Sequence, residues 1–106
     1  MRHNGAHVTV IDKPIADLAV HVRDALVVIT GTGSPSLVTR AMVHERHILI
    51  DAGTSESAGK IVGDIDPAAA SVARLITPVP NGVGPVTVAM LMRNLCILAR
   101  ARSGEK

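Results

Sequence analysis

The stretch Thr77-Pro78-Val79-Pro80-Asn81-Gly82-Val83-Gly84-Pro85-Val86-Thr87 decides the fold. Its three prolines restrict the backbone and its two glycines free it, a combination typical of a rigid irregular loop. The apolar pair Leu75-Ile76 precedes the loop, and a long apolar segment from Val86 to Arg102 follows it. We expect that segment to be a helix with Pro85 at its first position, because a proline there removes no helical hydrogen bond.

The composition of the loop leaves two interpretations of its role open. Backbone N–H groups at the start of a helix favour an anionic or carbonyl-bearing ligand, so the loop could form one wall of a binding site. The same prolines and glycines would also serve a stiff connector that binds nothing.

Length and composition exclude several classes of protein. A chain of 106 residues has room for one domain with a modest core. Hydrophobic residues make up 47% of the chain and aromatic residues 0%, so the core must be aliphatic. Without aromatic rings there is no surface on which bases could stack, and the net charge is only +2. We therefore expect no nucleic-acid partner.

The start of the chain, the lengths of its apolar runs and its single cysteine suggest a cellular location. The first residues, Met1 to Gly5, contain no apolar stretch of the signal-peptide type, and we expect no run to approach membrane-spanning length. Cys96 lies in the apolar segment near the C-terminus, where we expect a buried, unreactive thiol that suits a reducing compartment. These features predict a cytoplasmic protein with no membrane partner.

Strand-like and helix-like segments alternate along the first third of the chain. Ala6–Ile11 is rich in β-branched residues and predicts a strand. Apolar residues recur at helical spacing between Pro14 and Arg23, which predicts an amphipathic helix. Ala25–Thr30 is continuously apolar, as in a parallel strand covered on both faces. Strand, helix and strand at this spacing indicate an α/β fold with a parallel sheet.

The later segments continue this alternation. We expect the last helix, from Val86, to be buried on more than one side, because its few polar residues leave most of its circumference apolar. The other predicted elements are one or two helical turns over Leu37–Val43, a strand over His47–Ile50, a surface loop over Thr54–Lys60, a strand over Ile61–Ile65, and a helix over Ala68–Arg74 that Asp66 caps and Pro67 begins.

One cluster of side chains suggests a metal site. His44, Glu45 and His47 are all metal-ligand types, but their spacing is not that of the zinc-protease helix motif. A solvated turn is the simpler interpretation, and we predict no metal site.

Three motifs resemble one enzyme family in the same order along the chain. They are His47-Ile48-Leu49-Ile50-Asp51-Ala52-Gly53, Ile61-Val62-Gly63-Asp64-Ile65-Asp66, and the stretch from Ile76 through the loop to Met92. They are similar to the C-terminal part of the bifunctional methylenetetrahydrofolate dehydrogenase/cyclohydrolase family. The resemblance runs from about Ala6 to Ala101 and implies a partial Rossmann-like parallel sheet with flanking helices. Residues 1–106 would form an incomplete NAD(P)-binding domain, with the first strand and phosphate loop preceding Met1.

The resemblance implies NADP or NAD as cofactor. In dinucleotide folds an acidic residue near the end of the second strand commonly binds the adenosine ribose, and Asp12 is placed for this. Asp12 favours NAD, Lys13 would suit the 2′-phosphate of NADP, and both could simply open the next helix. Gly31 follows a strand, and either admits the dinucleotide or forms an ordinary turn. By resemblance, Gly53 and Thr54 would lie beside the nicotinamide. The candidate cofactor-binding residues are Asp12, Lys13, Gly31, Gly53, Thr54 and Thr87.

The loop would supply the wall that faces the folate substrate and the cofactor. Relatives mostly carry glycine where Asn81 stands, and asparagine tolerates the left-handed backbone that glycine adopts. The candidate substrate-binding residues are Pro80, Asn81, Gly82, Val83, Gly84, Pro85, Val86, Thr87 and Val88.

The resemblance implies an oxidoreductase and hydrolase of one-carbon metabolism. The family oxidises 5,10-methylenetetrahydrofolate with NAD(P)+ and hydrolyses the methenyl product to 10-formyltetrahydrofolate, using a tyrosine and a lysine of its first domain. This chain has no tyrosine, so we predict no catalytic residue and a fragment that is inactive alone, needing its catalytic domain or a homodimer partner. The alternative is a non-catalytic dimerisation or interaction module whose last helix binds another copy or a full-length relative.

Overall fold

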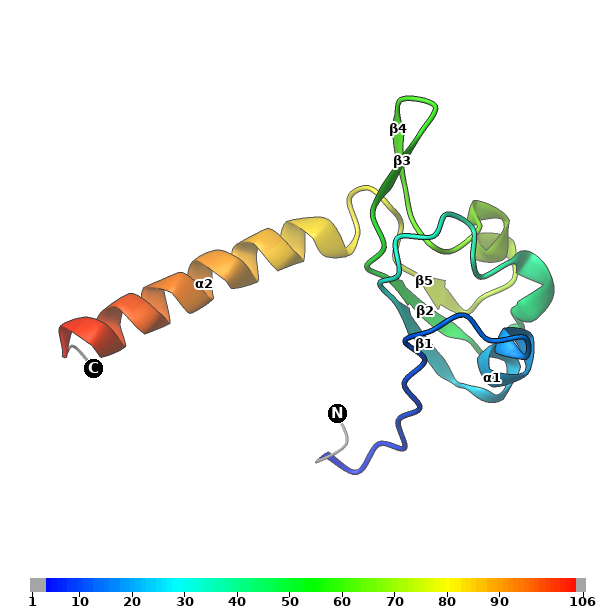
Figure 1. Ribbon diagram of the computed structural model, residues 1–106, viewed down its shortest axis with the longest axis horizontal. Helices are drawn as coiled ribbons and strands as arrows, with labels where there is room; N and C mark the ends of the chain where they lie inside the picture. Colours follow the sequence, from blue (N-terminus) through cyan, green and yellow to red (C-terminus); the bar gives the residue numbers. More distant parts are fainter. Residues whose placement is uncertain (1–3, 105–106) are drawn as a thin grey trace.

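The computed structural model describes residues 4–104 and contains a three-stranded parallel sheet in the order β1-β2-β5 (Figure 1). Strand β1 (Val27–Thr30) pairs with β2 (Ile48–Asp51), which in turn pairs with β5 (Leu75–Ile76). The predicted α/β class and parallel sheet are confirmed. The expectation of no leader rests on residues 1–5, and residues 1–3 lie outside the described range.

Three short helices cover one face of this sheet. Helix α1 (Leu18–Asp24) and the 3₁₀ turns η2 (Arg40–Met42) and η3 (Pro67–Ser71) lie together on that side (Figure 1). The buried core forms between them and β2, and it is entirely aliphatic, as the composition requires. Its members are Val22, Val38, Val43, Leu49, Ile65 and Ala69.

The helices are shorter than the sequence predicts. Helix α1 begins at Leu18 and not at Pro14, and Ile15 is 38% exposed, so the first predicted turn has little apolar packing to hold it. Val38 forms a parallel bridge with Ile65, which leaves only the single turn η2 of the predicted Leu37–Val43 helix. The predicted helix over Ala68–Arg74 is the 3₁₀ turn η3; its expected cap is confirmed, since Asp66 accepts the N–H of Ala68 at 3.0 Å.

A β-hairpin replaces the predicted surface loop at Thr54–Lys60. Strands β3 (Ser55–Ser57) and β4 (Lys60–Val62) pair antiparallel and project from the sheet (Figure 1). The two turn residues, Ala58 and Gly59, have φ values of 50° and 77°, the left-handed geometry that suits a two-residue hairpin. Alanine is a poor signal for that geometry, which is why the sequence did not indicate the hairpin.

The predicted strand over Ala6–Ile11 is wrong, because these residues belong to neither sheet. Strand propensity reflects packing on a half-buried pleated surface, and Val10 remains 69% exposed. Strand β1 is likewise not covered on both faces as predicted. Val27 and Ile29 are 38% and 54% exposed, since no described helix packs on their side of the sheet.

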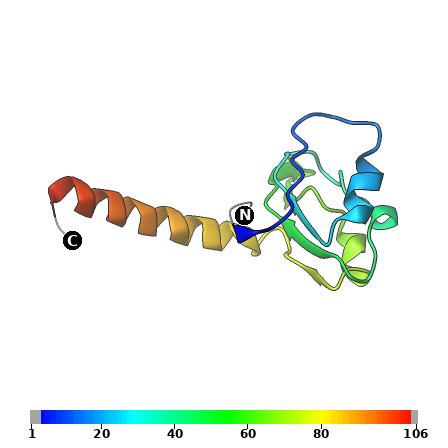
Figure 2. The ribbon, with the colours of Figure 1, turned by 90° about the horizontal axis from the view of Figure 1, so that it is seen from below.

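Helix α2 (Val83–Ser103) extends away from the sheet in both views (Figures 1 and 2). None of its residues is buried, so the expected burial of the helix and of Cys96 is wrong for this chain. A helix of 21 residues is about 31 Å long, far longer than a sheet whose strands have two to four residues. The helix begins at Val83, which places Pro85 third, still within the first turn where an N–H lacks a helical partner.

Helix α2 also corrects the expectation that no run approaches membrane-spanning length. By length and composition it is long and apolar enough to cross a membrane. Arg93, however, stands near its middle, where a charged side chain would lie at the costly centre of the bilayer. Core helices of soluble proteins meet the same criterion, so the helix is weak support for a membrane segment.

His47 is buried, and the predicted solvated turn is wrong for this residue. Its Nδ1 accepts the His44 N–H at 2.9 Å, which leaves Nε2 as the donor to the Val22 carbonyl at 2.7 Å. The His44 ring stacks on it with centroids 3.7 Å apart. The His47 ring therefore links the end of α1, through Val22, to the turn before β2, through His44. Among residues 4–104, no three His, Cys, Asp or Glu side chains gather as a metal ion would require.

We predict that His47→Leu lowers the free energy of unfolding by about 2–4 kcal/mol, because the Val22 carbonyl and the His44 N–H lose their partner. Urea unfolding followed through the NMR signals of the β2 amides measures this effect without the large circular-dichroism signal of α2. His7→Leu, at an exposed position, is the matched control. Equal unfolding midpoints for the two variants would contradict the role assigned to His47.

Candidate functional site

The carboxylate of Asp51, at the end of β2, joins three separate segments of the chain. Its Oδ1 accepts the Thr30 hydroxyl at 3.1 Å, the Gly53 N–H at 3.0 Å and the Asp64 N–H at 3.1 Å. Its Oδ2 accepts the Ile65 N–H at 3.0 Å. The residue is only 3% exposed, and these four donors replace the water that a buried carboxylate loses. Asp51 therefore fixes the ends of β1 and β2 against the segment after β4.

The backbone of Asp51 also fixes the start of the proline-rich loop. Its N–H donates to the Thr77 hydroxyl at 2.9 Å, and the Thr77 N–H donates to the Leu49 carbonyl at 3.0 Å. The loop thus leaves β5 at a defined position beside the end of β2.

Two glycines leave space for two aspartate carboxylates at this edge of the sheet. A Cβ on Gly53 would clash with the Asp64 carboxylate, and a Cβ on Gly63 would clash with the Asp51 carboxylate. Asp64 is fully buried, and its Oδ2 accepts the Thr32 N–H at 2.6 Å and the Thr32 hydroxyl at 2.9 Å. This pair of bonds holds the loop after β1, whereas Oδ1 of Asp64 has no partner among the described residues.

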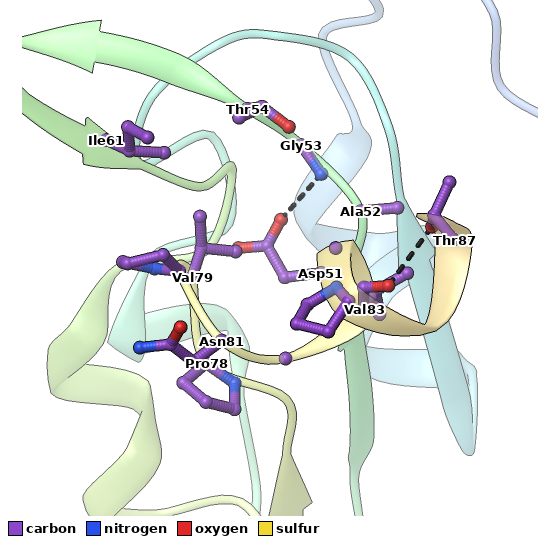
Figure 3. Close-up of a pocket in the computed structure, with 14 residues that line it drawn as sticks. Asp51, Ala52, Gly53, Thr54, Ile61, Pro78, Val79, Asn81, Val83 and Thr87 are labelled. Atoms are coloured by element: carbon purple, nitrogen blue, oxygen red, sulfur yellow. Dashed lines mark hydrogen bonds between the residues drawn. The ribbon is translucent and has the colours of Figure 1, made fainter. Parts of the chain in front are cut away.

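A cavity of about 380 Å³ opens beside Gly53 at the carboxyl end of β2 (Figure 3). In open α/β sheets, ligands bind at this end of the strands. Its walls come from the end of β2, the hairpin, the proline-rich loop and the first turns of α2. The lining residues are Asp51, Ala52, Gly53, Thr54, Ile61, Pro78, Val79, Pro80, Asn81, Gly82, Val83, Gly84, Pro85 and Thr87.

The cavity brings together most, but not all, of the predicted site residues. Three of the cofactor candidates line it: Gly53, Thr54 and Thr87. So do the substrate candidates from Pro80 to Pro85. Five predicted residues do not line it, namely Asp12, Lys13, Gly31, Val86 and Val88. The first two lie exposed ahead of α1, and the last two lie exposed on α2. Their binding roles stay predictions.

The backbone of the loop has the irregular shape that its composition predicts. The Val79-Pro80 peptide bond is cis, and Asn81 has a φ of 74°, which confirms that asparagine occupies the left-handed conformation here. Gly82 packs against the Pro78 carbonyl so closely that a Cβ would clash with it. The loop conformation therefore depends on the residue types at these positions.

The sequence did not single out Asp51, Thr77 or Ile61 as parts of the site. Asp51 was recognised only as part of a strand-end motif, and its role emerges once β1, β2 and the segment after β4 are adjacent. The available signal was an aspartate two residues before a glycine, matched by the Gly63-Asp64 pair later in the chain. Ile61 reaches the cavity only because the hairpin forms.

Comparison with known proteins gives a consistent result. Residues 1–103 match the family described as tetrahydrofolate dehydrogenase/cyclohydrolase, NAD(P)-binding domain. Bifunctional protein FolD of Staphylococcus aureus is 41% identical over 101 residues, which cover 93% of this chain and 35% of that protein. The chain thus spans about a third of the length of the curated relatives it matches.

Two solved structures show the same fold. The 5,10-methylenetetrahydrofolate dehydrogenase of the silkworm Bombyx mori has a TM-score of 0.76 and 40% identity, covering 84% of this chain and 30% of its own. The dehydrogenase-cyclohydrolase of Trypanosoma brucei, complexed with NADP cofactor and inhibitor, has a TM-score of 0.72 and 38% identity, covering 83% of this chain and 33% of its own. The predicted Rossmann-like arrangement is confirmed.

We predict that Asp51→Asn lowers the free energy of unfolding by about 2–4 kcal/mol, because the new NH₂ group would face an N–H donor in place of an acceptor oxygen. Urea unfolding read at the amides of Gly53 and Ile65 measures the loss. Asp12→Asn, at an exposed position, makes the same chemical change and should leave the midpoint unchanged. A stable Asp51→Asn variant with unaltered amide shifts would show that the carboxylate does not organise the site.

Proposed function

The chain belongs to the tetrahydrofolate dehydrogenase/cyclohydrolase family through its NAD(P)-binding domain, and we propose that it is part of a folate one-carbon enzyme. The proposed activity is oxidation of 5,10-methylenetetrahydrofolate to 5,10-methenyltetrahydrofolate with NAD(P)+, followed by hydrolysis to 10-formyltetrahydrofolate. The NADP complex of the Trypanosoma brucei relative supports this cofactor class.

The cavity at the carboxyl end of β2 is the observation that carries the proposal. Its volume of about 380 Å³ and its largely apolar lining, with a few polar groups, are typical of a small-molecule site. The cavity therefore suits the nicotinamide end of a dinucleotide. In this proposal Gly53, Thr54 and Thr87 hold that end, and the loop from Pro80 to Pro85 faces the folate. A bound dinucleotide supplies the hydride acceptor; the chain itself positions the reactants and excludes water.

No acid or base for the reaction is assigned to this chain. The chain contains no tyrosine, and the carboxylates of Asp51 and Asp64 accept hydrogen bonds from the protein's own N–H and hydroxyl groups. We propose that these two aspartates act as scaffold and that proton transfer depends on residues of a catalytic domain or partner. The cytoplasmic location stays a prediction.

We expect calorimetric titration of the 106-residue chain to show saturable binding of NADP+ or NAD+ at one site. A preference for NADP+ that falls about 10-fold in Lys13→Ala would assign Lys13 to the 2′-phosphate, as expected for a charge-assisted contact. A preference for NAD+ that is lost in Asp12→Ala would assign Asp12 to the ribose. Saturable binding of neither dinucleotide by the folded chain would contradict the proposal.

A second candidate function, an interaction module, is favoured by the exposure of α2. Val88, Leu91, Leu95 and Leu98 recur at helical spacing along one side and are 59–68% exposed. An apolar stripe of this kind commonly marks an interaction surface. In the enzyme the catalytic domain would cover it; in the module a second copy would.

If the module is the function, Leu95→Lys should convert a self-associated chain to a monomer, because a charge would enter the apolar contact. Sedimentation velocity across a concentration series measures this change. Ala89→Lys adds the same charge on another side of the helix and should leave the association intact. A wild-type chain that is monomeric at all concentrations would rule out a module that works by self-association.

A further inference from the structure

Among the lining residues from Pro78 to Pro85, Asn81 is the one with a polar side chain. The other lining residues of this range are prolines, valines and glycines, and Asn81 stands among them between Pro80 and Gly82. The apolar rings of the prolines offer contact surfaces to the faces of a planar ligand. Between Pro78 and Pro85, any directional contact with the ligand's edge by a side chain therefore falls to the Asn81 amide.

The backbone conformation of Asn81 does not require the amide side chain. Its φ of 74° lies in the left-handed region, which glycine adopts without strain. The fold therefore does not need a side chain at this position. Within residues 4–104 no hydrogen bond to the Asn81 amide is present, and Figure 3 shows the side chain apart from the bonded Asp51 carboxylate. The amide is therefore free to bond to a ligand.

Two other polar groups near the loop are already engaged. The Gly53 N–H donates to Asp51 at 3.0 Å, and the Thr87 hydroxyl donates to the Val83 carbonyl at 3.1 Å (Figure 3). The Asn81 amide, by contrast, offers two N–H donors and one carbonyl acceptor side by side. The complementary ligand edge carries an acceptor next to a donor, as a carboxamide or a ring lactam does.

We propose that Asn81 is a specificity-determining residue that binds the amide-type edge of a planar heterocycle in the cavity. This inference rests on the proposed function, and two ligands of that function carry such an edge: the nicotinamide carboxamide of the cofactor and the pterin lactam of the folate. The shared chemistry is a neighbouring carbonyl and N–H on or beside an aromatic ring.

The test compares three variants of the 106-residue chain in titrations with NADP+ and, separately, tetrahydrofolate. Asn81→Gly removes the amide without backbone strain, and Asn81→Asp keeps the shape but removes the donor. Asn94→Asp makes the same change on exposed α2, away from the cavity. We expect both Asn81 variants to bind one ligand about 3- to 10-fold more weakly, the range for neutral hydrogen bonds, and Asn94→Asp to bind as wild type does.

The ligand that weakens identifies the source of the edge. The urea midpoint of Asn81→Gly should equal or exceed that of wild type, because glycine suits the positive φ. Weaker ligand binding by this variant would then report lost recognition and not lost folding. If wild type binds NADP+ or tetrahydrofolate, and Asn81→Gly binds every ligand that wild type binds equally well, this inference alone is overturned. If the folded wild-type chain binds neither ligand, the inference and the proposed function fall together.

Discussion

The structure depends on one buried carboxylate. Removing Asp51 from water is costly unless donors replace the lost hydration, and the chain supplies four of them from Thr30, Gly53, Asp64 and Ile65. Those donors come from segments up to 35 residues apart in the sequence. Meeting the requirements of one side chain therefore places the end of β1, the end of β2 and the segment after the hairpin at a single edge of the sheet.

The cavity follows from that constraint. The strand end turns sharply at Gly53, where the Asp64 carboxylate leaves no space for a side chain. Thr77 starts the proline-rich loop beside Asp51, and the loop conformation at Asn81 and Gly82 then carries the chain around the opening into α2. A rigid loop and a rigid strand end thus face each other across a space of about 380 Å³. Such preorganisation is what a site needs to hold a cofactor and a substrate edge to edge.

The sequence predicted the parts whose causes are local. Apolar runs located β1 and β2, Asp66 and Pro67 marked the start of η3, and Asn81 indicated a left-handed backbone. It missed what depends on distant partners. His47 is buried because Val22 presents a carbonyl to it, and Asp51 matters because four donors converge on it. Conversely, Ala6–Ile11 and α2 have the composition of buried elements, yet no described surface covers them. The pattern alone therefore predicted a strand that does not form and a burial that α2 does not have.

The central claim is that the cavity held by Asp51 is the dinucleotide site. The most direct test is a titration of the ¹⁵N-labelled chain with NADP+, followed through its amide signals. The account predicts progressive shifts at Gly53, Thr54 and the non-proline amides from Asn81 to Thr87, with the amides of α1 unmoved. Shifts that avoid the cavity, or a spectrum of the folded chain that does not change, would contradict it.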